Sequence, residues 1–481
     1  MEIRQELARQ NPWWTNPSSI DGDPYLKALE SSPFKWTPRI KNEISLDGEY
    51  IYTLRGCRQV GKTTLIKSLI KELLENQNFS KDIFYFPLDL VNENELLLEI
   101  LRTYLKLFPP KGRRYIFLDE ITNVPEWQKA IKYLKDSAEL QNTCLVLTGS
   151  SAADIRRGAE RLPGRRGKKT ELDKVLFPLS FSEFAISSGV KLPGNPGQFS
   201  LSEMLFSENF WKTIEETFPF LDKFQEVLEK YLVVGGLPVA LRDFLQLGGV
   251  SNITHELYRA AIMGELEKWG KSYAYTFGTL RKIKESLTTP LSWDNLARGS
   301  GIVGGTTAKD YAELLAESFL LFILYFLDPS KRKQRPVKGK KIYFADPLIY
   351  HLVSHTEERR ILSPESPPIF LTSIEQGQLI ENLIGMHIYR SVERDPNIPF
   401  MPQDLFCWHS KKGREIDFLA REGEFIAIET KYQSHISGSD LLTMRNTFKK
   451  GLVVSRDVLE EKNGIRIIPA SLFLWFLKLR A

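Results

Sequence analysis

The stretch Gly56-Cys57-Arg58-Gln59-Val60-Gly61-Lys62-Thr63 decides the fold, because it fits the phosphate-binding pattern G-x-x-x-x-G-K-[ST] at every fixed position. A β-branched and aromatic run at residues 50–54 precedes it, and leucines and isoleucines recur at helical spacing between residues 65 and 74. A buried strand therefore leads into the loop, and a helix leaves it with its N-terminus facing the bound anion. This order predicts a P-loop in an α/β protein that binds ATP or GTP.

The P-loop pattern also assigns individual roles. Backbone N–H groups of the loop would surround phosphate oxygens, Lys62 would reach the β- and γ-phosphates, and the Thr63 hydroxyl would ligate Mg²⁺. The predicted nucleotide-binding residues are Gly56, Cys57, Arg58, Gln59, Val60, Gly61, Lys62, Thr63 and Thr64.

A second apolar run, residues 115–118, ends in Asp119-Glu120. Parallel strands present their carboxyl ends at the ligand-binding edge of an open α/β sheet, so this pair resembles a Walker B motif. Asp119 would hold Mg²⁺, and Glu120 would orient and deprotonate the attacking water. An acidic pair after a strand can also be a helix cap, but beside a P-loop the catalytic interpretation is favoured.

A third apolar run, residues 144–147, is followed by hydroxyl side chains. Thr148 and Ser150 are equal candidates for a sensor of the γ-phosphate, and a cap of the next helix is the alternative. Residues 156–169 are densely basic, and an arginine there, such as Arg165, could reach a neighbouring subunit's γ-phosphate in an oligomer. A solvated loop would give the same pattern.

Composition limits the function classes. The net charge of +5 is small for 481 residues, so any contact with DNA must depend on local clusters. Three cysteines and six histidines show neither disulfide nor metal-ligand spacing, which suits a reducing cytosol. The first residues lack the apolar core of a signal peptide and no stretch has the length of a membrane span, so we expect a soluble cytoplasmic protein.

Residues 276–345 have the pattern of a winged helix, with helices expected at 280–287, 292–298 and 306–317. Seven cations follow within eleven residues and could contact phosphates along a duplex: Lys331, Arg332, Lys333, Arg335, Lys338, Lys340 and Lys341. The third helix offers only Lys309 as a cation and carries three acidic residues, which suits DNA poorly. DNA contact through the wing and interaction with a protein partner therefore both remain open.

Near the C-terminus, two β-rich runs flank the turn at residues 421–424 and predict a hairpin. Alternation places Glu415, Asp417, Glu429 and Lys431 on one face. If the turn centres on Gly423, Asp417 lies opposite Glu429 at about 5 Å, where the two carboxylates would repel unless a divalent cation bridged them. Lys431 could then position water or stabilise a phosphate transition state, although an exposed hairpin with alternating charges gives a similar pattern.

These residues together resemble a known family. The runs LRGCRQVGKTT (54–64), FLDEI (117–121), LTGSS (147–151), PLSFSEF (178–184), GGLP (235–238) and KIYFAD (341–346) are similar to those of prokaryotic AAA+ ATPases with a C-terminal domain of unknown function numbered 4143. Cys57 stands where the family commonly has proline, and the segment before residue 45 lies outside the shared motifs. The glycine pair of GGLP is interpreted as a structural turn, and Trp13-Trp14 as core packing.

The resemblance implies an α/β protein with an AAA+ P-loop core, a helical lid, a winged helix and a restriction-endonuclease-like α/β C-terminal domain. The implied segments are an N-terminal extension (1–45), the ATPase core (46–190), the lid (191–275), the winged helix (276–345) and the nuclease-like domain (346–481). Asp417, Glu429 and Lys431 resemble the D…ExK core of the PD-(D/E)xK nucleases, and Glu381, on a helix expected at 377–387, resembles their additional acidic residue.

Two functions are compatible with this sequence. One is an ATP- and Mg²⁺-dependent machine, a homo-oligomer or a nucleotide-dependent oligomer, that acts on DNA and cleaves it or binds it without cutting. The other is a nucleotide switch that acts on a protein partner, with a catalytically inactive C-terminal domain. Both need Lys62 and Asp119, but only the cleaving machine needs Asp417 and Lys431.

Overall fold

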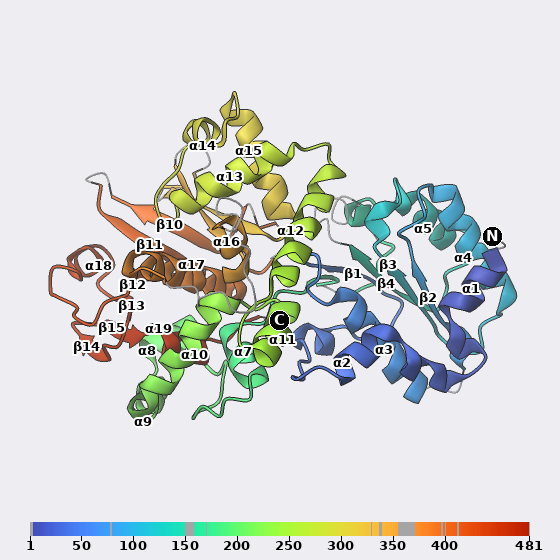
Figure 1. Cartoon of the computed structure of the whole chain (residues 1–481), viewed down its shortest axis with the longest axis horizontal. Coiled ribbons are helices and arrows are strands. Elements are labelled where there is room, and N and C mark those ends of the chain that lie inside the picture. The colour runs from blue at the N-terminus through green and yellow to red at the C-terminus, as the bar shows by residue number, and fades with distance from the viewer. Residues whose placement is uncertain are drawn as a thin grey trace. The chain divides into compact units, whose positions relative to one another are not determined.

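The computed structural model of the chain describes residues 3–76, 79–149, 158–169, 171–328, 330–335, 339–354, 371–395, 398–399, 401–410 and 413–480. The chain divides into two compact units, Met1–Phe177 and Pro178–Ala481, which are described separately below (Figure 1). The finer division into lid, winged helix and nuclease-like domain stays a prediction.

A parallel sheet of five strands in the order β2-β3-β4-β1-β5 forms the centre of the first unit. Its strands are β1 (Ile51–Arg55), β2 (Ile83–Pro87), β3 (Arg114–Asp119), β4 (Thr143–Gly149) and β5 (Asp173–Val175). The three strands expected from the sequence are β1, β3 and β4, and all their residues are buried, as parallel strands covered on both faces require. This confirms the α/β class with the parallel sheet of a P-loop ATPase.

Helices cover both faces of this sheet. They are α1 (Ile3–Gln10), α2 (Pro24–Glu30), α3 (Lys62–Asn76), α4 (Asn94–Leu107) and α5 (Trp127–Asp136). Short 3-10 turns in this unit span Pro12–Trp14, Pro17–Gly22, Arg39–Glu43, Ser80–Asp82 and Ile121–Asn123. Figure 1 shows α4 and α5 on one side of the sheet and α3 on the other. The core on the α4 and α5 side joins Leu97, Leu101 and Ile131 to the sheet residues Phe84 and Ile116.

The second unit begins with helices whose starts are defined by polar caps. They are α7 (Phe181–Ser187), α8 (Leu201–Phe206), α9 (Glu208–Thr217), α10 (Leu221–Val234), α11 (Pro238–Leu247) and α12 (Asn252–Glu267), with a 3-10 turn at Phe218–Phe220. Ser180 and Glu183 form a capping box at α7, and Ser200 and Glu203 form another at α8. Serine followed three residues later by glutamate is readable in the sequence and marks where each helix begins.

The glycine pair between α10 and α11 is structural, because it is tied to a buried aspartate. The Gly236 N–H donates to Asp346 Oδ2 at 2.7 Å, and a Cβ at Gly235, whose φ is +72°, would lie 2.1 Å from Asp346 Oδ1. The second oxygen of Asp346 accepts the N–H of Leu348 at 2.8 Å. Two motifs more than one hundred residues apart in the sequence, GGLP and KIYFAD, therefore meet at one carboxylate.

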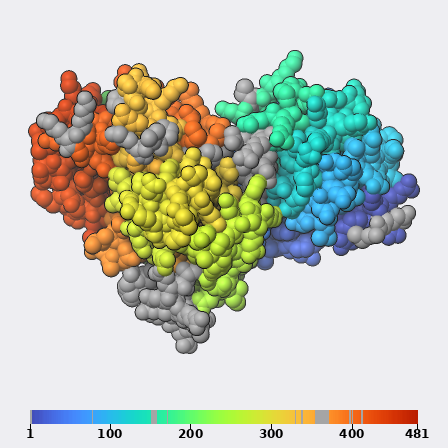
Figure 2. All heavy atoms as spheres, turned by 90° about the horizontal axis from the view of Figure 1, so that it is seen from above, coloured from blue at the N-terminus to red at the C-terminus, as the bar shows by residue number. Residues whose placement is uncertain are grey.

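Three helices and two short antiparallel ladders follow: α13 (Tyr273–Glu285), α14 (Trp293–Ser300), α15 (Gly305–Glu317), β6 (Leu321–Tyr325) paired with β9 (Lys340–Phe344), and β7 (Leu327–Asp328) paired with β8 (Lys333–Gln334). The helices match the expected three, with the first beginning earlier than predicted. Ser292 caps α14 by accepting the N–H of Asn295 at 3.1 Å. Residues of α13 to α15, yellow in Figure 2, lie at the surface of this unit.

The expectation that seven cations line one exposed basic segment is wrong for two of them. Lys340 and Lys341 lie in β9 and are only 1% and 2% exposed. Lys340 places its ammonium 3.9 Å from the centre of the Trp293 ring, where burial and then Lys309 lower its pKa to about 8. Lys331, Arg332 and Lys333 are exposed, whereas Lys338 lies outside the described residues.

A mixed sheet in the order β10-β11-β12-β13-β15-β14 ends the second unit. Its strands are β10 (Leu405–His409), β11 (Glu415–Glu422), β12 (Glu424–Lys431), β13 (Gly451–Ser455), β14 (Glu460–Lys462) and β15 (Ile465–Pro469). The helices of this part are α16 (Pro347–Ser354), α17 (Ser373–Val392), α18 (Leu442–Thr447) and α19 (Ala470–Phe476). In Figure 1 α17 lies along this sheet, and it packs against β9 as well as β11 and β12.

The predicted hairpin is β11 and β12, and its register is the expected one. Glu422 pairs with Glu424, so the turn centres on Gly423, whose φ is +76°. Phe418 pairs with Ile428, which places Asp417 and Glu429 at the next step of the antiparallel pair. The helix expected at 377–387 is α17, which is longer at both ends. Among the described residues, no helix combines the length and the apolar character that a membrane span requires.

Candidate functional site

The P-loop holds a buried cation at the start of α3. Lys62 donates from Nζ to the carbonyl oxygens of Gly56 at 3.0 Å and Cys57 at 3.2 Å, and Nζ lies 3.7 Å from Glu120 Oε1. Gly56 has a φ of +149°, and a Cβ there would lie 2.4 Å from the carbonyl oxygen of Leu176. Glycine is required at this position, since a side chain would collide with the main chain leaving β5. The loop thus combines a lysine with a helix N-terminus, both of which favour bound anions.

Asp119, at the end of β3, is fixed by hydroxyl groups from three different elements. Its Oδ2 accepts from the Thr63 hydroxyl at 2.7 Å and from the Tyr85 hydroxyl at 3.2 Å, and its Oδ1 accepts from the Thr148 hydroxyl. The residue is 4% exposed. The carboxylate therefore has one orientation, next to the first turn of α3.

Glu120 follows in a left-handed backbone conformation, with a φ of 53°. Its N–H donates to the Thr148 hydroxyl oxygen at 3.0 Å, and its carboxylate turns toward Lys62. Thr148 therefore links the main chain of Glu120 to the side chain of Asp119. The Thr148 hydroxyl is thus engaged as both donor and acceptor, and its role as γ-phosphate sensor stays a prediction.

Of two other predicted groups, the structure describes only Arg165, which is not part of this cluster. Ser150 lies outside the described residues. Arg165 pairs with Asp136, with Nε 2.6 Å from Oδ1 and Nη2 3.1 Å from Oδ2. An arginine-finger role for Arg165 stays a prediction, and it would require this exposed ion pair to open.

The N-terminal segment packs on the sheet. The indole N–H groups of Trp13 and Trp14 both donate to the carbonyl oxygen of Ile83, at 3.0 and 2.9 Å, which confirms the packing interpretation of this pair. Trp14 also stacks on Tyr104, with ring centres 5.7 Å apart. The segment before residue 45 is therefore part of the first unit's core.

A contact that the sequence did not predict joins this segment to Asp119. Lys67 on α3 lies 3.2 Å from Asp23 Oδ2, and its ammonium lies 3.4 Å from the centre of the Tyr85 ring. Burial, and next Asp119, raise the pKa of Tyr85 far above its usual value, so its hydroxyl stays a donor. No local pattern marks Tyr85, because its role depends on β2 lying beside β3, an order that one sequence does not reveal.

The oxygen atoms around Asp119 fit Mg²⁺. A threonine hydroxyl and a carboxylate lie together beside a loop suited to phosphates, and Mg²⁺ takes oxygen ligands, usually one or two from the protein and others from phosphate and water. Thr63 and Asp119 are the residues that would hold the ion.

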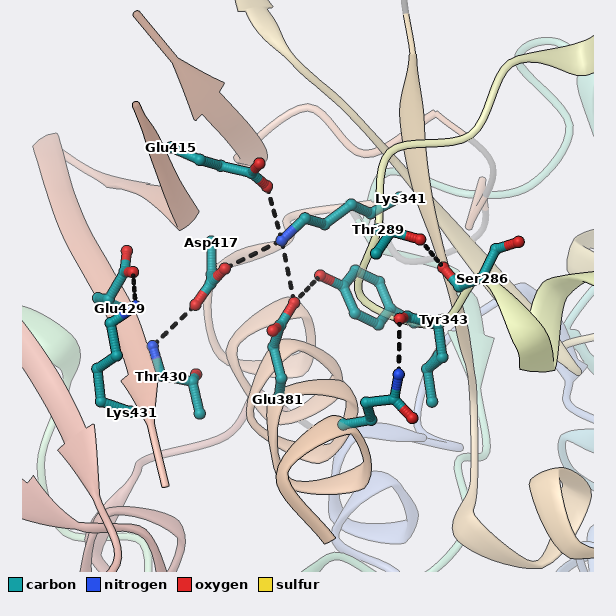
Figure 3. Close-up of polar contacts among 12 residues, drawn as sticks. Ser286, Thr289, Lys341, Tyr343, Glu381, Glu415, Asp417, Glu429, Thr430 and Lys431 are labelled. Carbon is teal, nitrogen blue, oxygen red and sulfur yellow. Dashed lines mark hydrogen bonds and ion pairs between the residues drawn. The ribbon is translucent and has the colours of Figure 1, made fainter. Parts of the chain in front are cut away.

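A second cluster of charged residues lies in the C-terminal unit (Figure 3). Helix α17 supplies Glu381, β11 supplies Asp417, and β12 supplies Glu429 and Lys431. The structure thus brings the four predicted residues to one place. Strand β9 adds Lys341, which the sequence had assigned to the exposed wing.

Lys341 lies at the centre of this acidic cluster. Its Nζ donates to Glu381 Oε1 at 3.1 Å and to Asp417 Oδ1 at 3.0 Å, and it lies 2.8 Å from Glu415 Oε1, where it pairs by charge without an aligned hydrogen bond. Tyr343, two residues along the strand, donates its hydroxyl to the same Glu381 oxygen at 2.8 Å. Three carboxylates therefore share one buried ammonium.

On the β12 side, some of the carboxylate oxygens have hydrogen-bond or ion-pair partners and one does not. The Thr430 N–H donates to Asp417 Oδ2 at 2.9 Å, and Lys431 Nζ lies 2.8 Å from Glu429 Oε1. Among the described residues, Glu429 Oε2 is buried without a hydrogen-bond partner. Both oxygens of Asp417 are thus used, whereas one oxygen of Glu429 is not.

The charges of the cluster alter its pKa values. Burial, and then Asp417, raise the pKa of Glu381 to about 8 and that of Glu429 to about 7. Burial opposes the charge of Lys341, but Asp417 and Glu381 outweigh it and raise the pKa of the ammonium above its usual value. Lys341 is therefore a permanent cation, and the carboxylates around it compete for one positive charge.

The cluster does not fit a divalent metal ion as it stands. Ca²⁺ and Mg²⁺ need about six oxygen ligands close around one point, and Lys341 Nζ already contacts the Asp417 and Glu381 oxygens nearest to it. Within the described residues, no group of three or more His, Cys, Asp or Glu side chains is arranged to hold a metal. The place of Lys341 in this cluster was not predicted from the sequence, because the residue was counted in a run of surface charges. Alternation along the strand, which places Lys341 and Tyr343 on one face, was the available signal.

Three families match successive parts of the chain. They are described as "AAA domain" (residues 48–185), "Domain of unknown function (DUF8612)" (residues 225–360) and "Domain of unknown function (DUF4143)" (residues 376–473). Two relatives come from Methanocaldococcus jannaschii. Uncharacterized protein MJ1637 is 24% identical over 91% of this chain and 87% of its own length, and uncharacterized protein MJ1544 is 21% identical over 78% and 73%.

Solved structures similar to the chain include the Walker-type ATPase PABY2304 of Pyrococcus abyssi, with a TM-score of 0.40 and 14% identity over 65% of this chain and 93% of that one. Cdc6p from Pyrobaculum aerophilum has a TM-score of 0.24 and 13% identity over 73% and 96%. The residues matched by the AAA domain include the P-loop of the first unit, and those matched by DUF4143 include the mixed sheet of the second. The chain therefore carries an AAA ATPase domain and a C-terminal DUF4143 domain, the family that its motifs predicted.

Proposed function

We propose that the first unit hydrolyses ATP at the edge of its parallel sheet. The observation that supports this most is the meeting of Thr63, Asp119 and Thr148 beside the Lys62–Glu120 pair, since each group then has a role in phosphoryl transfer. Lys62 would leave its carbonyl partners for phosphate oxygens, and Glu120 would orient the attacking water. Mg²⁺, held by Thr63 and Asp119, would neutralise charge on the phosphates.

The test separates binding from hydrolysis. Glu120→Gln keeps the shape of the side chain but removes the base, so we expect ATP binding to persist while turnover falls about 10²- to 10⁴-fold. Lys62→Ala should lose nucleotide affinity. Glu99→Gln, the same change at an exposed glutamate of α4, is the control and should hydrolyse ATP at the wild-type rate. Turnover by Glu120→Gln close to wild type would remove Glu120 from the mechanism.

An oligomer would place a cation of one subunit at the nucleotide of the next. We propose Arg165 for this role, because it lies in a basic segment on the unit that carries the P-loop. Arg165→Ala should then lower turnover about 10³-fold without loss of ATP binding, whereas Arg161→Ala, an exposed arginine of the same segment, should not. Equal activity of both variants, measured on the species that light scattering identifies with ATP present, would contradict the role.

For the second unit we propose contact with DNA through residues 331–333, just before and at the start of β8. The three helices α13 to α15 and the strands β6 and β9 support a winged helix, and its exposed cations Lys331, Arg332 and Lys333 are in the segment that would form the wing. The third helix does not favour DNA, because Lys309 is 3.6 Å from Glu313 and is already paired. Any contact would therefore be with phosphates and independent of sequence.

Salt dependence tests this contact. Three phosphate contacts would give a slope of about −2.7 in a plot of log affinity against log salt, since each contributes about −0.9. Lys331→Ala/Lys333→Ala should make the slope shallower by about 2, and Lys212→Ala/Lys230→Ala, two exposed lysines elsewhere in the unit, should leave it unchanged. An identical slope for both double variants, measured by fluorescence anisotropy of a labelled duplex, would exclude the wing.

The second candidate function is a nucleotide switch that acts on a protein partner. One observation favours it: Lys341 pairs with Glu381 and Asp417, two members of the quartet Glu381, Asp417, Glu429 and Lys431, and so competes with any metal ion for their oxygens. Cleavage by this quartet stays a prediction. ATPase activity that no linear, branched or single-stranded DNA changes, with the DNA intact in Mg²⁺ and Mn²⁺, would favour the switch over the DNA-processing machine.

A further inference from the structure

The acidic cluster of the second unit contains its own cation. Lys341 is 2% exposed, and it reaches carboxylates on two elements, α17 and β11, that are separate from its own strand. A buried ammonium that paired with one carboxylate would be an ordinary ion pair. Here a single ammonium joins three carboxylates, those of Glu381, Glu415 and Asp417, on the side of Asp417 that faces α17.

The distances from Nζ to the carboxylate oxygens are those expected around an ammonium, and a divalent ion cannot occupy the same position together with it. Nζ donates to Glu381 Oε1 at 3.1 Å and to Asp417 Oδ1 at 3.0 Å, and it lies 2.8 Å from Glu415 Oε1, with which it pairs by charge. A divalent ion would take oxygens at about 2.0 to 2.6 Å, and its charge would repel the ammonium at that separation. Asp417 Oδ2 is turned to the Thr430 N–H, so it is already hydrogen-bonded.

We propose that Lys341 is the resident cation of this centre and that it keeps divalent metal ions out. One carboxylate oxygen of the cluster could become a metal ligand once the ammonium is removed. Glu429 Oε2 is buried and has no hydrogen-bond partner among the described residues, and Glu429 is 9% exposed. Removal of the ammonium would leave the carboxylates of Glu381, Asp417 and Glu429 with Lys431 as the remaining cation among the cluster residues described above. This exclusion of metal ions involves only the second unit and does not depend on ATP hydrolysis.

The experiment measures Mn²⁺ bound to the full chain without nucleotide, by electron paramagnetic resonance of the free ion. Any Mn²⁺ at the P-loop is common to all variants, so the acidic cluster is assessed by the number of bound Mn²⁺ ions per chain that Asp417→Asn removes. In the wild-type background we expect Asp417→Asn to remove no bound Mn²⁺ at millimolar concentration. For Lys341→Met, which keeps the length but removes the charge, we expect about one additional ion per chain, which Lys341→Met/Asp417→Asn should lose.

A matched control is available on the same strand. Lys340 is also buried in β9, but it lies against Trp293 instead of the carboxylates, so Lys340→Met should bind no additional Mn²⁺. Mn²⁺ should also raise the unfolding temperature of Lys341→Met more than that of wild type or Lys340→Met, because only the first gains an additional site that the folded state alone possesses.

Lys341→Met leaves excess negative charge and could fail to fold. Lys341→Met/Glu415→Gln removes one negative charge along with the ammonium and keeps Glu381, Asp417 and Glu429, so it serves as the second variant with the same expected gain of one ion. Two results would overturn the proposal: wild-type protein that binds an Mn²⁺ ion removed by Asp417→Asn, or a folded variant without Lys341 that binds no more Mn²⁺ than wild type.

Discussion

Asp173 on β5 should stabilise the strand that leads into the P-loop, and its contribution should depend on pH. The residue before the loop, Arg55, is fully buried and places Nη2 2.9 Å from Asp173 Oδ1, while Arg166 Nη1 lies 2.8 Å from Oδ2 and the Thr53 hydroxyl donates to Oδ1. Burial raises the pKa of Asp173, but Arg166 and Arg55 outweigh it and lower the pKa from 3.8 to about 2. The charged form is therefore favoured by folding.

The magnitude follows from this shift. A fall from 3.8 to about 2 corresponds to about 2.4 kcal/mol, since one pKa unit equals about 1.36 kcal/mol. Because the pKa is lower in the folded state, this stabilisation is present above pH 3.8 and is lost as the pH falls toward 2. At pH 3 roughly half of it should remain. In Asp173→Asn this pH-dependent part is absent, and a further loss independent of pH arises because Arg55 keeps a buried charge with fewer partners.

The assay is urea unfolding of wild type and Asp173→Asn from pH 7 to pH 3, followed by a probe confined to the first unit. The difference in unfolding free energy should be largest at pH 7 and should shrink by about 1 kcal/mol at pH 3, since half of the linked stabilisation is lost. Asp136→Asn, which breaks an exposed pair with Arg165, should change stability little at either pH. A difference for Asp173→Asn that stays constant with pH would refute the reasoning, because the carboxylate would then not have a lowered pKa.

Two further predictions concern contacts that the sequence did not reveal. Thr148→Val removes the hydroxyl that joins Asp119 to the Glu120 N–H. Because a hydrogen bond to a charged group contributes about 1.5–3 kcal/mol, kcat should fall roughly 10- to 100-fold. Thr148→Ser keeps the hydroxyl and should retain most of the wild-type kcat, so equal rates for the two variants would contradict a positioning role. Gly236→Ala should destabilise the second unit by about 1–3 kcal/mol or prevent its folding, since the new Cβ would lie 2.0 Å from the carbonyl oxygen of Leu179, whereas Gly249→Ala, in open space, should not change the melting temperature.

Sequence alone predicted the parts of the fold that depend on local order. The P-loop, its strand and its helix are contiguous, so a fixed spacing of glycines, lysine and threonine reports all three at once. The hairpin of β11 and β12 was predictable for a similar reason: alternation fixes which residues share a face, and the turn at Gly423 fixes the register. Asp417 and Glu429 therefore lie near each other as expected.

The contacts that were missed join segments far apart in the sequence. Tyr85 reaches Asp119 only because β2 lies beside β3, and Lys341 reaches Asp417 only because β9 and β11 both pack against α17. A run of lysines and arginines indicates a solvated segment on average, yet Lys340 and Lys341 begin a buried strand. Net charge over a window carries no information about where that strand begins.

The charge balance of the acidic cluster explains why a complete motif need not indicate an active site. Glu381, Glu415, Asp417 and Glu429 face two lysines, Lys341 and Lys431, which leaves two negative charges to be compensated by a divalent ion or by protons. With Lys341 in place, Glu429 Oε2 is a buried carboxylate oxygen that has neither a hydrogen bond nor a contact with Lys341 among the described residues, and one oxygen cannot hold a hard cation that needs several ligands. Protons are then the remaining means of compensating the negative charge. The pKa values of Glu381 and Glu429 are raised mainly by burial, which is consistent with protonation of these carboxylates. Four residues that resemble a nuclease motif can therefore lie together in the structure while one further lysine, supplied by a distant strand, determines whether a metal can enter.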